Sequence, residues 1–98
     1  MSSPAIGAQA TRFETGASLT HASAKAALEA GRRQIAAGAT AVDCASLAQF
    51  DSSALAVLLA WRRTALARGA NLEIVNLPAG LASLARAYGV DTLLSGRH

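Results

Sequence analysis

Apolar residues along this chain follow two different spacings, which alternate from the N-terminus to the C-terminus. Three stretches place apolar residues three and four positions apart, which predicts helices over residues 20–38, 54–69 and 79–89. Each is preceded by a shorter stretch with the composition of a strand, at residues 11–17, 40–47 and 71–78. Strand and helix therefore alternate three times with short connections. This order predicts an α/β fold with a small mixed, mostly parallel sheet flanked by helices.

The predicted helices carry start and stop signals that indicate where they begin and end. Thr20 or Ser23 can cap the first helix, and Pro78 suits the start of the third. A glycine follows each helix, where a left-handed residue commonly ends one: Gly38, Gly69 and Gly89. After the third helix, the sequence "VDTLL" closes the fold with the apolar pair Leu93 and Leu94.

Alternation within the strands predicts which side chains face the core. In residues 40–47, Val42 and Cys44 share one face and Asp43 points to the other. In the last strand the pattern places Leu72, Ile74 and Asn76 on one face, and Glu73 and Val75 on the other. Cys44 is the only cysteine, so we interpret it as a small core residue and expect neither a disulfide framework nor a thiolate metal cluster.

The helix predicted over residues 54–69 is apolar around more of its circumference than one buried face requires. One apolar stripe contains Leu55, Leu58, Leu59 and Arg62. A second stripe contains Ala54, Val57 and Trp61. We expect the first stripe to meet the sheet and the second to remain for a partner protein, with Trp61 as an anchor of the kind enriched at interfaces. The alternative is that Trp61 covers the edge of the core.

Composition and charge disfavour several classes of function. The chain has a formal net charge of +3, but its basic residues are dispersed as single residues or pairs, without a basic run interleaved with aromatics. We therefore do not expect nucleic-acid binding. The longest apolar run, residues 54–61, is far shorter than the roughly 20 residues that a membrane-spanning helix needs. The N-terminus also lacks the pattern of a signal peptide, so we expect a cytoplasmic protein.

The 98 residues suit one domain, which we place at residues 11–95. Residues 1–10 are rich in Ser, Ala and Gly, and we expect them to form a flexible N-terminus or to supply an edge strand. Residues 96–98 are expected to form a tail.

The stretch "FDSSAL", residues 50–55, joins a predicted strand to a predicted helix, where α/β folds commonly carry functional groups. Asp51 or Ser52 can cap the helix by accepting hydrogen bonds from its first free N–H groups. A hydrolase would need Ser52 or Ser53 as the nucleophile and His21 as its base, with Asp51 orienting the imidazole. The stretch does not form the G-x-S-x-G elbow of such enzymes, so hydrolysis is the least favoured interpretation.

No pattern for a cofactor or a metal is found in the sequence. The glycine-rich loop and lysine of a P-loop are absent, so we expect no bound nucleotide. Candidate metal ligands exist, but they have no recurring ligand spacing: His21, Asp43, Cys44 and Asp51. A regulatory switch is a further interpretation of the turn. A hydroxyl at a helix N-terminus can be phosphorylated at little cost to the fold, because the helix dipole favours negative charge there.

The strand "AVDCASL", the turn "FDSSAL" and the C-terminal part "NLEIVNLPAGLASLARAYGVDTLL" together resemble a STAS domain. This fold is shared by anti-sigma factor antagonists, sulfate-transporter tails and the small cytoplasmic subunit of the Mla phospholipid-transport ABC system. The resemblance covers about residues 12 to 95. Within it, "NLP" and "LARAYGVD" are most similar to the Mla-type subunit.

The resemblance implies a non-enzymatic docking module that needs no cofactor. Ser52 matches the hydroxyl residue that a kinase phosphorylates in the antagonists and that faces the ATPase in Mla-type subunits, while Asp51 and Ser53 shape the turn. Ala54 stands where the family commonly has Gly, which favours a docking contact over a phosphorylated switch. The residues implied in partner binding are Leu19, Thr20, His21, Ala54, Leu55, Val57 and Trp61.

The partner implied is the ATPase subunit of an ABC transporter, which would place the protein at the inner face of the inner membrane. An anti-sigma factor kinase is the alternative partner. A homodimer is a further assembly compatible with the resemblance.

Overall fold

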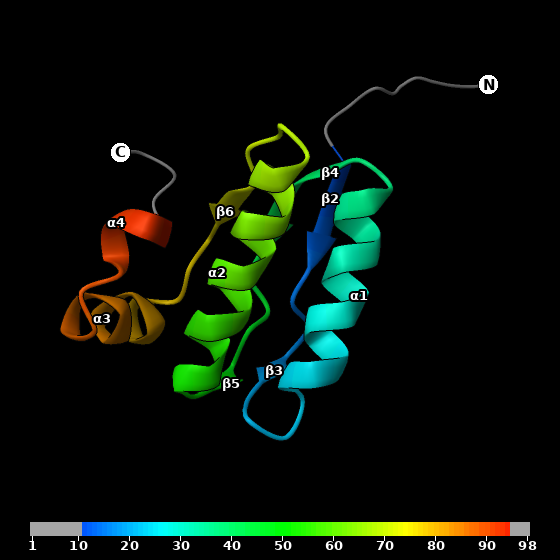
Figure 1. The fold of residues 1–98 in the computed structure, drawn as a ribbon. Helices are drawn as coiled ribbons and strands as arrows, with labels where there is room; N and C mark the ends of the chain where they lie inside the picture. The colour runs from blue at the N-terminus through cyan, green and yellow to red at the C-terminus, as the bar shows by residue number, and fades with distance from the viewer. Residues whose placement is uncertain (1–10, 95–98) are drawn as a thin grey trace.

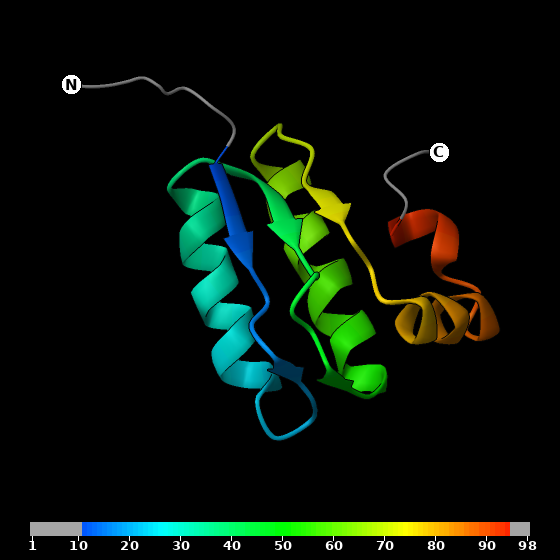
Figure 2. The same cartoon turned by 180° about the vertical axis from the view of Figure 1, so that it is seen from behind.

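A three-stranded parallel sheet forms the centre of the fold in the computed structural model of the chain, which describes residues 11–94. Its strands lie in the order β2 (Thr11–Glu14), β4 (Ala39–Asp43) and β6 (Glu73–Val75). One face is covered by the helices α1 (Ala24–Ala36) and α2 (Ser52–Ala67) (Figure 1). Seen from behind, the other face carries no helix of the described residues (Figure 2). Two further helices follow β6 and contact α2: α3 (Ala79–Ala87) and α4 (Asp91–Leu94).

The structure confirms the predicted α/β fold with a mostly parallel sheet flanked by helices. Every strand pairing in the described part of the chain is parallel. Two short strands were not predicted, namely β3 (Ser18–Leu19) and β5 (Gln49–Phe50), because two residues are too few to show an alternating pattern. The predicted apolar pair at the end of the chain is divided, since Leu94 is buried in the core and Leu93 is exposed.

Two predictions fall on residues that the structure does not describe. The flexible segment or edge strand at residues 1–10 and the tail at residues 96–98 lie outside the described range. Within residues 11–94, no helix combines the length and the hydropathy needed to cross a membrane.

Trp61 lies between α1 and α2 and is 2% exposed. Its indole covers Gly31 of α1, where any larger side chain would overlap the ring. The indole nitrogen donates a hydrogen bond of 3.1 Å to the carbonyl of Leu28, and Phe13 of β2 meets the ring edge-on at a centroid distance of 5.1 Å. Trp61 is therefore a packing residue at the edge of the core, as the alternative interpretation held, and it has almost no surface to offer as a partner anchor.

Both apolar stripes of α2 are buried, contrary to the expectation that one would remain for a partner. Ala54, Val57 and Trp61 of the second stripe belong to the same core cluster as Leu55 and Leu58 of the first. The physical reason is that α2 is contacted by α1 on one side and by α3 and α4 on the other, in addition to the sheet beneath it. The exposed face of α2 is a narrower one, containing Ser52, Ala56, Arg63, Leu66 and Ala67.

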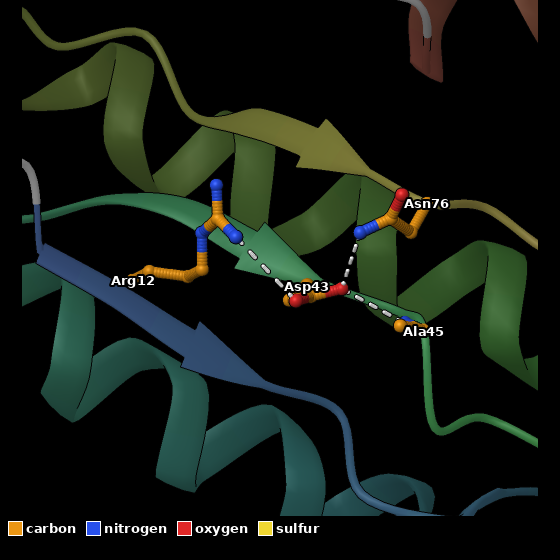
Figure 3. A network of polar contacts seen from close by, with 4 residues as sticks. All are labelled: Arg12, Asp43, Ala45 and Asn76. Atoms are coloured by element: carbon orange, nitrogen blue, oxygen red, sulfur yellow. Dashed lines mark hydrogen bonds and ion pairs between the residues drawn. The ribbon is translucent and has the colours of Figure 1, made fainter.

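Asp43, the last residue of β4, connects all three central strands. Its carboxylate lies 3.5 Å from the guanidinium of Arg12 on β2 and accepts hydrogen bonds from the amide of Asn76 and the backbone N–H of Ala45 (Figure 3). The Asn76 hydrogen bond, followed by that of Ala45, lowers the pKa of Asp43. Val42 and Cys44 lie in the core and Asp43 lies opposite, as predicted.

The predicted placement of Asn76 with Leu72 and Ile74 was wrong. Asn76 follows the end of β6 and has a φ of 58°, in the left-handed region that Asn tolerates better than most residues. This conformation ends the strict alternation of the strand. The side chain thereby reaches the carboxylate of Asp43 on the opposite face of the sheet.

Candidate functional site

The short parallel pair of β3 and β5 brings two loops together at one end of the molecule (Figure 1). Ser18 pairs with Gln49 and Leu19 pairs with Phe50. Because the strands are parallel, the loop after β3 and the turn after β5 leave the pair at the same end. The loop at residues 20–23 therefore lies beside the FDSSAL turn.

Asp51 holds these two segments together and caps α2. One carboxylate oxygen accepts a hydrogen bond of 2.8 Å from the backbone N–H of Ser53, in the first turn of the helix. The other accepts one of 3.0 Å from the backbone N–H of His21. The predicted cap is confirmed, and Asp51 rather than Ser52 provides it. The hydrogen bond from His21, followed by that from Ser53, lowers the pKa of Asp51, because both stabilise the ionised form.

Ser52 is the first residue of α2, and its side chain is exposed. Within residues 11–94 its hydroxyl has no hydrogen-bond partner. Ser53 is half-buried, and Ala54 is fully buried in the core. Of the two hydroxyls in the turn, that of Ser52 is therefore the more available to another protein.

The geometry does not form the catalytic arrangement that a serine hydrolase would need. Both oxygens of Asp51 accept hydrogen bonds from backbone N–H groups, which is a capping arrangement and does not orient an imidazole. In the described part of the chain, no hydrogen bond joins the His21 ring to either serine hydroxyl. The site is therefore shaped to present Ser52, and no group among residues 11–94 is placed to activate it.

Metal and thiol chemistry have no site among the described residues. No three His, Cys, Asp or Glu side chains of residues 11–94 gather closely enough to hold a metal ion. Cys44 is fully buried in the core, which raises the pKa of its thiol to about 11. The interpretation of Cys44 as a small core residue is thus confirmed.

The residues expected to bind a partner divide into a surface group and a core group. His21 is exposed and Thr20 is half-buried in the loop held beside the FDSSAL turn, and the backbone N–H of Thr20 donates a hydrogen bond to the hydroxyl of Ser23. Five side chains are instead buried in the core: Leu19, Ala54, Leu55, Val57 and Trp61. A partner of the folded domain would therefore meet Thr20, His21 and Ser52, a surface that we call the Ser52 rim.

Sequence reasoning missed a second surface, a groove between α1 and α2 that begins at Ser53. The groove has a volume of about 460 Å³. Its lining residues are Ala24, Lys25, Leu28, Arg32, Ser53, Ala56, Val57, Ala60 and Arg63. The sequence does contain an indication of this surface. Lys25 and Arg32 are two helical turns apart and therefore share one face of α1, and Ser53 and Ala60 share one face of α2 in the same way.

Comparison with known families finds a match over most of the chain. Residues 4–95 match a family model described as "Mlab, STAS domain". This range includes every described residue, the Ser52 rim and the α1/α2 groove. No match to the chain was found among curated proteins.

Proposed function

The chain belongs to the STAS domain family, and from this premise we propose that it is a non-enzymatic subunit that binds and supports the ATPase of an ABC-type phospholipid transporter. The description of the matching family model, together with the residues of the C-terminal part, favours the Mla type within the family. The observation that carries the proposal is the Ser52 rim. Asp51 fixes this rim by binding the loop of His21 and the first turn of α2 at once.

Such a rim suits a supporting subunit because its geometry is set before the partner arrives. Residues from two distant parts of the chain are presented together, and neither segment has to be ordered on binding. A preorganised surface loses less conformational entropy on association than a flexible one. The subunit would work in the cytoplasm, held at the inner face of the inner membrane by its ATPase.

The direct test is reconstitution with the ATPase subunit of the phospholipid ABC transporter from the same organism. We expect the purified chain to bind the ATPase in a defined ratio and to raise its stability or its ATP turnover. Failure of the two purified proteins to associate would overturn the proposal. Light scattering on the chain alone would show in the same experiment whether it forms a homodimer.

A second candidate function is that of an anti-sigma factor antagonist controlled by phosphorylation of Ser52. The observation in its favour is the exposed Ser52 hydroxyl at the N-terminus of α2, where the dipole and free N–H groups favour added negative charge. Mass spectrometry of the protein purified from its native cell distinguishes the two functions. Stoichiometric phosphate on Ser52, together with recovery of a sigma-regulating kinase, would favour the antagonist. Turnover of ester substrates that is lost in Ser52→Ala would instead indicate a hydrolase.

A further inference from the structure

The α1/α2 groove has an apolar floor and a basic rim. Its apolar lining consists of the half-buried Leu28, of Ala24, Ala56 and Ala60, and of Val57, which is itself only 4% exposed. Lys25, Arg32 and Arg63 stand around it and are all exposed. The groove begins at Ser53, directly next to the Ser52 rim, so the two surfaces are continuous.

The charge of the groove is uncompensated. None of its lining residues is acidic. The helices α1 and α2 together carry five cations and one carboxylate, that of Glu29, and Glu29 does not line the groove. Within residues 11–94, the one ion pair is between Arg12 and Asp43 on the sheet, so the three groove cations have no carboxylate partner.

The shape of the groove suits a helix. It lies between two helices, and three of its lining residues on α2 have small side chains, namely Ser53, Ala56 and Ala60. Small side chains in such a groove allow the backbone of another helix to approach closely. Amphipathic helices commonly bind grooves of this kind through apolar side chains three and four positions apart.

We propose that the α1/α2 groove is the docking site for an acidic amphipathic segment of the partner ATPase, a proposal that rests on the proposed function. Apolar side chains of the segment would cover Leu28, Ala56 and Ala60. Its Asp or Glu side chains would pair with Lys25, Arg32 and Arg63. The Ser52 rim would then contact the part of the ATPase next to this segment.

Two other occupants fit the groove less well. In a twofold dimer formed through the groove, the same surface of the two copies would meet. Arg32 and Arg63 of one copy would then face the same cations of the other. An anionic membrane would attract the cations, but the large apolar side chains that line the groove are withdrawn from the surface, since Leu28 is half-buried and Val57 is buried. Apolar side chains must protrude to enter a bilayer, and these do not.

The proposal is tested with a charge-reversed pair in the groove and a matched pair outside it. The groove variant is Arg32→Glu with Arg63→Glu, and the control is Arg33→Glu with Arg86→Glu, which makes the same change in net charge at exposed positions that do not line the groove. Binding to the purified ATPase is measured by titration at low and at high salt. Circular dichroism establishes that both variants are folded.

We expect the groove variant to bind the ATPase at least about tenfold more weakly and with less dependence on salt, and the control to bind within about threefold of the unaltered chain. Equal affinities for the groove variant and the control would overturn the docking proposal, while binding by the unaltered chain upholds the proposed function. Absence of binding by the unaltered chain overturns both. Two further results would overturn the docking proposal. Binding to anionic vesicles that is lost only in the groove variant would assign the groove to a membrane, and self-association that is lost only in this variant would assign it to a second copy of the chain.

Discussion

One carboxylate oxygen of Asp51 lies 3.0 Å from the backbone nitrogen of His21, a residue thirty positions earlier in the sequence. The other oxygen of the same side chain caps α2 through Ser53. A single side chain thus fixes the start of a helix and the position of a distant loop. The surface around Ser52 depends on both.

Replacing Asp51 by Ala should therefore loosen the Ser52 rim. We expect Asp51→Ala to lower the melting temperature by a few degrees, and Asp51→Asn to lower it less, because Asn retains an oxygen for the cap. Hydrogen exchange of the His21 amide should become faster in both variants. An unchanged exchange rate at His21 in Asp51→Ala would show that the loop is held by other contacts.

Stability should fall in acid, and Asp51 and Asp43 should account for much of the change. The pKa of each is lowered in the folded state from its ordinary value of 3.8, so both stabilise the fold above that value and lose this contribution as the pH falls through the lower folded pKa. Urea unfolding between about pH 6 and pH 2 should show this decline. The variant Asp43→Asn with Asp51→Asn should start less stable and show a flatter profile. An equally steep profile in that variant would assign the acid sensitivity to other carboxylates.

Position 31 has to be glycine because the indole of Trp61 lies directly against its backbone. Ala is normally favoured over Gly inside a helix by about 1 kcal/mol. Here we expect the opposite sign, with Gly31→Ala destabilising the fold by about 1–3 kcal/mol, because the added methyl group overlaps the ring of Trp61. In a Trp61→Leu background the same change should be nearly neutral. Chemical denaturation of the unaltered chain, the two single variants and the double variant measures the coupling between positions 31 and 61. A loss of stability on Gly31→Ala that persists in the Trp61→Leu background would contradict this explanation.

Arg62 is a buried cation with incomplete hydrogen bonding. It is 5% exposed, one guanidinium nitrogen lies 3.4 Å from the side-chain oxygen of Asn71, and the other is buried without a partner in the described part of the chain. Even a buried ion pair can often be replaced by apolar residues of similar volume with a neutral or stabilising effect of about 1–4 kcal/mol, and Arg62 has no carboxylate partner within residues 11–94, so we expect Arg62→Met to be at least as stable as the unaltered chain. Asn71→Ala should be less stable, because it removes the partner and leaves the charge. Strong destabilisation by Arg62→Met would mean that the guanidinium is paired in solution.

Ser52→Asp separates effects on folding from effects on docking. An acidic residue at the start of α2 interacts favourably with the helix dipole, so the variant should be no less stable than Ser52→Ala. Its affinity for the ATPase should nevertheless be lower than that of Ser52→Ala by about tenfold, because a charge in a desolvated contact costs more than a lost hydroxyl. Melting curves and titrations of the two variants provide the comparison. Equal affinities would place Ser52 outside the interface.

Local patterns predicted the regular elements of this fold well. The three long helices, the central strands and the opposite faces of Val42 and Asp43 were all apparent from spacing along the chain. Asn76 was misplaced because a positive φ at one residue ends the alternation, and nothing in the strand pattern marks that residue. The role of Trp61 was left open because the apolar stripes of a helix do not reveal how many other helices will pack against that helix.

The site was predicted less completely than the fold, because its geometry depends on contacts between distant residues. The cap at Asp51 is local and could be expected from the sequence. The hydrogen bond to His21 spans 30 positions and depends on strands of two residues, so no periodicity indicates it. The α1/α2 groove likewise arises from two helices whose relative placement is set by Gly31 and Trp61.

The long separation between His21 and Asp51 also makes the Ser52 rim a property of the folded chain alone. An unfolded chain would have to close a loop of 30 residues, at an entropic cost, to bring these two residues together. In the folded domain the parallel pair of β3 and β5 holds their segments side by side. A partner that recognises Ser52 and His21 together therefore discriminates folded chains from unfolded ones.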